Sequence, residues 1–148
     1  MIVTFCGHRE ILSGKDELRK RLITEIENLI KQGATEFLLG GYGDFDYMCA
    51  GVVKELKHTY PHIKSVLVKP YLTTPFDKWL YDESEYPPIE NTPKKFAIIK
   101  RNEYIIDCAD ILIAYVKYET GGAATTLKYA LKKNKTIINI AQIAGDNL

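Results

Sequence analysis

Cysteine is scarce in this sequence, and its spacing indicates no metal or disulfide chemistry. The three cysteines, Cys6, Cys49 and Cys108, are far apart and belong to no Cys-x-x-Cys or Cys/His pattern. Neither a disulfide framework nor a zinc site is therefore indicated. Reduced thiols in a cytosol are the simpler interpretation, and we expect no metal.

An excess of charge of one sign is also missing. The chain has 20 Lys and Arg against 19 Asp and Glu, which gives a formal net charge of +1, and the two signs are interspersed. A protein that binds nucleic acid usually shows a basic excess or a basic stripe. The charge balance therefore weighs against DNA or RNA as the main partner.

Long apolar runs are absent as well. No stretch approaches the ~18 residues of a membrane-spanning helix. Residues 1–5 resemble a strand and lack the charged-then-apolar order of a signal peptide. We therefore expect a cytoplasmic protein without a membrane partner.

Short apolar runs, in contrast, recur along the chain. They predict five strands, at Ile2–Phe5, Glu36–Leu39, Ser65–Val68, Ile111–Val116 and Thr136–Ile140. All but the third are nearly continuous apolar segments, as expected for parallel strands that are covered on both faces. Helical patterns lie between the strands, and the first of them carries Leu18, Leu22, Ile26, Leu29 and Ile30.

This alternation predicts a single α/β domain over residues 1–148. The expected fold is Rossmann-like: a doubly wound, mainly parallel five-stranded sheet with helices on both faces. Residues 71–93 are an exception, because they form a long connection rich in proline, acidic and aromatic residues. Such a connection is usually functional or mobile. We interpret it as a flap over a ligand site or, equally, as a cover for the sheet edge.

Polar and glycine-rich motifs follow the strands, at the ends where such sheets bind ligands. The run Gly-Gly-Ala-Ala-Thr-Thr, residues 121–126, opens the fourth helical pattern. Its small residues let a phosphate approach the N–H groups of the helix start, and Thr125 and Thr126 can add hydroxyl donors. The alternative is a tight turn without a ligand. Because neither a Walker sequence nor Gly-x-Gly-x-x-Gly is present, ATP hydrolysis and NAD-dependent hydride transfer lose support.

A second glycine turn, Gly-Gly-Tyr-Gly at residues 40–43, precedes Asp44 and Asp46. One aspartate is expected to cap the next helix, and we assign that role to Asp44 and ligand binding to Asp46. Arg9 and the pair Arg101-Asn102 are candidates to hold a phosphate or a base edge. His8 is either an acid–base group or a hydrogen-bonded loop residue.

Taken together, these motifs resemble a known group. Gly-His-Arg (7–9), Gly-Gly-x-Gly-Asp-x-Asp (40–46), Lys-Arg-Asn (100–102) before an apolar strand, and Gly-Gly-Ala-Ala-Thr-Thr (121–126) occur in the order seen in the SLOG superfamily. That superfamily includes the DNA-processing protein DprA, the LOG or "lysine decarboxylase-like" phosphoribohydrolases, and small YpsA-like proteins. The chain is most similar in length to the YpsA-like branch. The resemblance covers nearly the whole sequence and implies a nucleotide or ADP-ribose-type ligand.

The resemblance also separates binding from catalysis. LOG enzymes carry Pro-Gly-Gly-x-Gly-Thr-x-x-Glu, whose glutamate is expected to assist glycosidic cleavage. Gly121, Gly122 and Thr125 match this pattern, but Lys128 stands where the glutamate belongs. Arg101 matches the arginine of the LOG Arg-Lys pair, and Asn102 replaces the lysine. The lysine at position 128 puts LOG-type catalysis in doubt, although Asp46 or Glu119 remains available as an acid.

Three functions follow from these observations. The preferred one is a module that senses or sequesters a nucleotide-derived small molecule, such as an ADP-ribose derivative or a cyclic signalling nucleotide. The alternative is a phosphoribohydrolase or N-glycosidase acting on nucleoside monophosphates, and DNA binding is the least favoured. The resemblance further implies a homodimer or higher homo-oligomer. No catalytic residue, metal ligand or cofactor is assigned, and the predicted ligand-binding residues are Gly7, His8, Arg9, Gly40, Gly41, Tyr42, Gly43, Asp46, Arg101, Asn102, Gly121, Gly122, Ala123, Ala124, Thr125 and Thr126.

Overall fold

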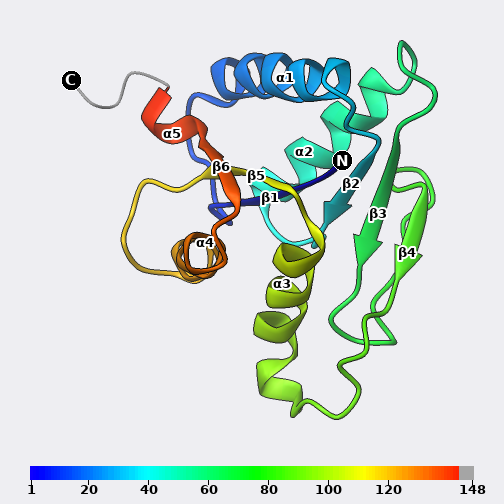
Figure 1. Ribbon diagram of the computed structural model, residues 1–148, viewed down its shortest axis with the longest axis vertical. Coiled ribbons are helices and arrows are strands. Elements are labelled where there is room, and N and C mark those ends of the chain that lie inside the picture. Colours follow the sequence, from blue (N-terminus) through cyan, green and yellow to red (C-terminus); the bar gives the residue numbers. More distant parts are fainter. Residues whose placement is uncertain (144–148) are drawn as a thin grey trace.

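A computed structural model describes residues 1–143 and shows one twisted sheet (Figure 1). Its strands pair in the order β4-β3-β2-β1-β5-β6, and every pairing is parallel. The strands are β1 (Ile2–Gly7), β2 (Glu36–Leu39), β3 (Lys64–Val68), β4 (Glu83–Glu85), β5 (Ile111–Tyr115) and β6 (Thr136–Asn139). The chain runs outward from β1 in one direction up to β4 and then returns to β5 on the other side. Ligands bind at such a switch point in open α/β sheets.

Helices cover both faces of the sheet (Figure 1). α1 (Lys15–Lys31) and α2 (Asp44–Leu56) pack on one face, and α3 (Ala97–Cys108) and α4 (Gly122–Lys132) pack on the other. A 3₁₀ turn, η1 (Lys94–Phe96), leads into α3, and α5 (Ile140–Ile143) follows β6. The predicted doubly wound α/β fold is confirmed.

Alternation along each strand explains why both faces need a cover. In β2, Phe37 and Leu39 belong to the core under α1 and α2, whereas Leu38 belongs to a separate cluster with Ile105 of α3. All three strand residues are at most 3% exposed. Because consecutive side chains point to opposite faces, a continuous apolar run marks a strand buried on both sides.

The strand count differs from the predicted five, because β4 lies inside residues 71–93. Its sequence, Glu-Ser-Glu, pairs with β3 through Val66–Glu83 and Val68–Glu85. An edge strand with solvent-facing acids shows no apolar run, so the sequence pattern did not reveal it. The interpretation of residues 71–93 as a cover for the sheet edge is therefore confirmed.

The single domain predicted over residues 1–148 stays a prediction. It includes residues 144–148, which lie outside the described residues. Within residues 1–143, no helix combines the length and the apolar character that crossing a membrane requires.

Candidate functional site

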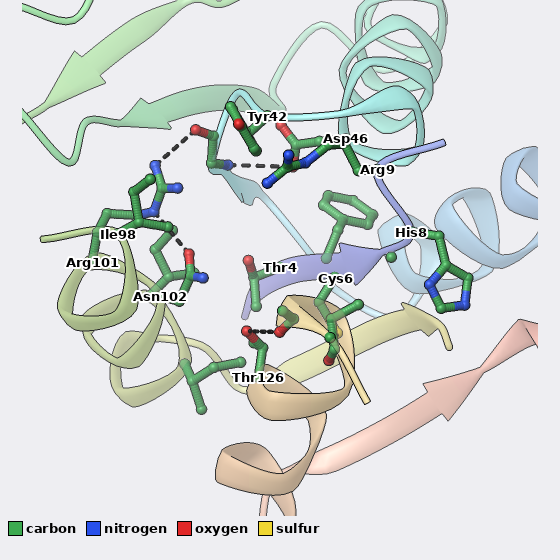
Figure 2. A pocket seen from close by; sticks show the side chains of 18 of the residues that line it. Thr4, Cys6, His8, Arg9, Tyr42, Asp46, Ile98, Arg101, Asn102 and Thr126 are labelled. Carbon is green, nitrogen blue, oxygen red and sulfur yellow. Dashed lines mark hydrogen bonds between the residues drawn. The ribbon is translucent and has the colours of Figure 1, made fainter. Parts of the chain in front are cut away.

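A cavity of about 360 Å³ opens at the carboxyl ends of β1, β2 and β5, between the starts of α2 and α4 (Figure 2). This volume lies in the range of small-molecule sites. The structure brings together residues from every predicted motif, which are separated by more than one hundred positions in the sequence. The predicted residues in the cavity wall are Gly7, His8, Arg9, Gly40, Tyr42, Asp46, Arg101, Asn102, Gly121, Gly122, Ala123 and Thr126.

Four predicted residues lie beside the cavity and not in its wall. Gly41 faces Leu67, whose Cδ1 would lie 2.5 Å from an added Cβ, and Gly43 faces the backbone of Arg9. Both glycines have positive φ, 75° and 98°, so they shape the turn. Ala124 is buried in the core under α4, and Thr125 faces a neighbouring groove.

The start of α4 contributes backbone donors to the wall. Gly121, at φ 103°, precedes the helix, and the first helical return bond joins Thr125 N to Gly121 O. The preceding N–H groups, of Gly122, Ala123 and Ala124, therefore have no acceptor within the helix. The first turn contains no acidic residue. These N–H groups and the helix dipole favour an anion at this point.

The threonine hydroxyls differ from the prediction. Thr125 Oγ1 donates to Gly121 O at 3.0 Å, and Thr126 Oγ1 donates to Gly122 O at 3.1 Å. Both hydroxyl protons are thus engaged within the helix, as is common for Ser and Thr side chains four residues after a carbonyl. The donors that α4 offers a ligand are backbone N–H groups, and the threonine oxygens remain as acceptors.

The turn at residues 40–43 is held from within by Asp46. The Asp46 carboxylate accepts hydrogen bonds from the N–H groups of Gly40 and Gly41 while it lines the cavity. Burial raises the pKa of Asp46, although these two N–H groups and the nearby Arg101 act in the opposite direction. The carboxyl therefore sits at the cavity wall with a stronger hold on its proton than a solvated aspartate.

Asp44 does not cap α2 with its side chain as predicted. Its backbone N–H donates to Arg9 O at 2.8 Å, and its Oδ2 accepts from the N–H of Ile11 at 2.9 Å. The aspartate thus ties the loop after β1 to the start of α2. The two helix starts therefore differ: the first turn of α2 contains the acidic Asp44 and Asp46, whereas the first turn of α4 contains no acidic residue.

Arg101 forms a buried wall of the cavity. It is 2% exposed, and its Nη1 donates to Gly40 O at 2.7 Å and to Val68 O at 2.8 Å. Its Nε donates to Asn102 Oδ1 at 2.8 Å. Within residues 1–143, Nη2 has no hydrogen-bond acceptor. Burial lowers the pKa of Arg101, but a guanidinium stays charged in proteins. The site therefore holds a buried positive charge with free donors (Figure 2).

Arg9 and Tyr42 stand together at the cavity mouth. The guanidinium carbon of Arg9 lies 4.4 Å from the centre of the Tyr42 ring, in cation–π geometry. Tyr42 is 54% exposed. The pair places a second positive charge at the entrance.

His8 is a hydrogen-bonded loop residue. Its Nε2 accepts from the backbone N–H of Lys117 at 2.8 Å, and its ring lies 5.0 Å from that of Tyr118. Burial and the charge of Lys117 lower the pKa of His8. The lowered pKa favours the neutral imidazole, and its ring is turned away from Asp46 and Arg101 (Figure 2).

Several wall residues were not predicted. Thr4 and Cys6 lie on β1, Thr120 precedes the glycines, and Ile98, Ile105 and Ile106 lie on α3. Thr4 is buried and its hydroxyl donates to Leu38 O at 2.9 Å, while burial raises the pKa of Cys6 to about 12. Alternation along β1 and helical spacing in α3 would have placed these side chains on the cavity side. None of the wall residues comes from residues 71–93, so the lining gives the interpretation of that segment as a flap no support, and it stays a prediction.

Two charged residues from the sequence comparison lie outside the wall. Lys128 Nζ donates to Glu119 O at 3.0 Å, so its ammonium group is directed at the loop before α4. Neither Lys128 nor Glu119 lines the cavity. Among residues 1–143, no group of three or more His, Cys, Asp or Glu side chains is arranged to hold a metal ion.

Comparison with known proteins identifies a family and a relative. The YpsA family model, described as "YspA SLOG family", matches residues 13–86, half of the chain. The uncharacterized SPbeta prophage-derived protein YoqJ of Bacillus subtilis (strain 168) is 28% identical over 143 residues, covering 78% of this chain and 81% of that protein.

Three solved structures share the fold. TM1055 is 16% identical with a TM-score of 0.64, covering 99% of this chain and 81% of its own. DNA processing protein A from Helicobacter pylori is 19% identical with a TM-score of 0.63, and the match covers 93% of this chain but 63% of that one. The molybdenum cofactor carrier protein from Chlamydomonas reinhardtii is 17% identical with a TM-score of 0.60, covering 92% of this chain and 73% of its own. At these identities the likeness shows the fold alone.

Proposed function

Because the chain belongs to the YspA SLOG family, we propose that it binds a nucleotide-derived small molecule in the cavity at the carboxyl end of the sheet. The ligand classes that fit are ADP-ribose derivatives and cyclic signalling nucleotides. The protein would sense or sequester such a molecule. The observation that carries the proposal is the open, acid-free start of α4 facing a buried arginine across one cavity.

The start of α4 and Arg101 together suit a phosphate. Three N–H groups without helical acceptors, those of Gly122, Ala123 and Ala124, meet the free Nη2 of Arg101 across the cavity. Charge-assisted hydrogen bonds to a phosphate are roughly twice as strong as neutral ones. Arg9 at the mouth adds attraction for an approaching anion.

The opposite end of the cavity suits a hydroxyl-bearing group. The Asp46 carboxylate there accepts hydrogen bonds and would repel a phosphate when ionised. Ribose hydroxyls can donate hydrogen bonds to such a carboxylate. A sugar toward Asp46 and a phosphate toward α4 is the orientation that the charges favour.

A search for bound ligand tests this proposal directly. Mass spectrometry of the purified, denatured protein should reveal a co-purified nucleotide, and isothermal titration with AMP, ADP-ribose and a cyclic dinucleotide should give saturable binding for at least one of them. A protein that is free of ligand after purification and binds none of the three compounds would contradict the proposal.

Cleavage of the ligand is the second candidate function. The place of Asp46 in the cavity wall favours it, because burial raises the pKa of this carboxyl, and a carboxyl with a raised pKa is better suited to protonate a leaving base. The absence of a carboxylate at position 128 speaks against it. Incubation with AMP and chromatography for free adenine and ribose 5-phosphate decides the question. Turnover that is lost in Asp46→Asn would establish the enzyme.

DNA is a partner of one structural neighbour, which is described by its single-stranded DNA binding mode. The net charge of +1 in this chain opposes that role. We expect no change in fluorescence anisotropy of a labelled single-stranded oligonucleotide at 0.15 M salt, roughly the physiological ionic strength.

A homo-oligomer and a cytoplasmic location are further proposals. Sedimentation equilibrium tests the first, and cell fractionation tests the second.

A further inference from the structure

A second, smaller hollow lies between α3 and α4. It has a volume of about 160 Å³. It is lined by Ile98, Ile99, Asn102, Glu103, Gly122, Thr125, Thr126 and Tyr129. We call it the α3–α4 groove.

The groove adjoins the cavity and shares part of its wall. Ile98 and Asn102 of α3 and Gly122 and Thr126 of α4 line both hollows. The start of α4, where we place the phosphate, is therefore the boundary between two compartments. A molecule held there by its phosphate has room to extend in both directions.

The two compartments differ in chemistry. The cavity wall includes the ionisable side chains of Asp46 and Arg101. The groove is bounded by Ile98, Ile99 and the ring of Tyr129, whose hydroxyl is turned to Asp107 at 2.9 Å. A sugar fits the first environment, whereas a flat apolar ring with a polar edge fits the second.

We infer that the α3–α4 groove is a second subsite, which takes the nucleobase of a two-ended ligand. This inference rests on the proposed function and specifies its ligand class. The phosphate groups lie at the start of α4, a sugar lies toward Asp46, and the base lies between Ile99 and Tyr129. A nucleoside diphosphate linked to a second sugar, as in ADP-ribose, fills both compartments, and a sugar phosphate fills one.

The polar groups of the groove select the edge of the base. Because Asn102 Oδ1 already accepts from Arg101 Nε, the Asn102 amide presents its N–H₂ donors. The Glu103 carboxylate is an acceptor on the same helix. A base edge with a donor beside an acceptor matches this pair, and adenine has such an edge.

The test compares three probes by isothermal titration: ADP-ribose, AMP and ribose 5-phosphate. Ile99→Asp places a charge in the groove at a position that is 46% exposed, so folding should be kept. We expect it to weaken ADP-ribose and AMP binding about tenfold, the scale of lost base stacking, and to leave ribose 5-phosphate unchanged. Leu131→Asp, at an exposed position of α4 outside the groove, is the matched control and should change none of the three.

The outcomes separate this inference from the proposed function. If wild-type protein binds ribose 5-phosphate as tightly as ADP-ribose, or if Ile99→Asp weakens all three probes equally, the groove is not a base subsite and the inference falls while phosphate binding stands. If none of the probes binds, both fall. If Ile99→Asp splits a dimer in ultracentrifugation and leaves probe preference unchanged, the groove is a subunit interface and the inference is wrong. Ile99→Ser repeats the test if Ile99→Asp fails to fold.

Discussion

At the scale of single residues, Arg101 links the fold to the site. Its Nη1 joins α3 to the carboxyl ends of β2 and β3, and its remaining donors face the cavity. Gly40 has no side chain at a point where an added Cβ would lie 3.2 Å from the guanidinium carbon. One buried residue therefore positions the wall and supplies its charge.

Replacing Arg101 by leucine should destabilise the fold. The carbonyls of Gly40 and Val68 would lose their donor, and an unsatisfied buried polar group costs about 1–3 kcal/mol. We expect urea denaturation to show a loss of about 3 kcal/mol in the free energy of unfolding. Arg19→Leu is the control: it removes a surface ion pair with Glu55, which should cost less than about 1 kcal/mol. Equal effects of the two substitutions would contradict the structural role of Arg101.

Asp46 should make the free energy of unfolding decrease as pH rises, which is the opposite of the usual effect of an aspartate. Because burial raises its pKa above the ordinary 3.8, the native state binds its proton more tightly than the unfolded state does. The contribution of Asp46 to the free energy of unfolding should therefore decrease as pH rises from the ordinary pKa through the raised one. Asp46→Asn removes this contribution, so the variant should gain stability relative to wild type over that window. Urea denaturation at a series of pH values measures it, and a pH-independent difference would contradict the raised pKa.

At the scale of elements, the two glycine turns have different roles. The turn before α2 is bonded to Asp46, and the turn before α4 leaves its N–H groups open. The sequence motifs look alike, because both are glycine-rich strand ends. The first turn of α2 contains acidic residues and that of α4 contains none. This difference is why we interpret the first turn as a support and propose the second as a phosphate site.

The edge strand β4 should matter for stability and not for binding. Asp82 precedes β4 and accepts from Ser65 N at 2.8 Å and from Lys57 Nζ at 2.8 Å. Asp82→Ala should lower the free energy of unfolding by about 1 kcal/mol and leave ligand affinity unchanged, because residues 71–93 do not line the cavity. Glu90→Ala, at an exposed position of the same segment, is the control. Weaker ligand binding in Asp82→Ala would contradict this expectation and support the interpretation of residues 71–93 as a flap.

The sequence predicts buried elements better than exposed ones. Strands such as β2 are apolar on both faces, so Phe37, Leu38 and Leu39 reveal them. β4 is polar and depends on pairing with β3, which no local pattern records. The cavity was predictable in outline because strand ends converge in this fold. The anchoring of Arg101 and the internal bonds of Thr125 depend on atoms brought together by folding, and the sequence alone does not show them.

At the scale of the whole molecule, sheet topology creates the site. β1 lies at the centre of the sheet, and the chain leaves it toward β2 on one side and returns to β5 on the other. The loops after these strands therefore separate and leave a cavity between the helices. Because the ligand would contact α2, α3 and α4 together, binding should stabilise the entire domain. A ligand at ~100 times its dissociation constant adds about 2.7 kcal/mol.

The most direct test of the central claim uses two glycines with open space around them. Gly122→Asp places a carboxylate at the start of α4, where it is compatible with the helix but repels a phosphate, and Gly51→Asp makes the same change in α2 outside the cavity. Thermal denaturation with and without ADP-ribose is the measurement. We expect the ligand to raise the Tm of wild type and Gly51→Asp by several degrees and to leave that of Gly122→Asp unchanged. An equal rise in all three proteins would contradict phosphate binding at α4.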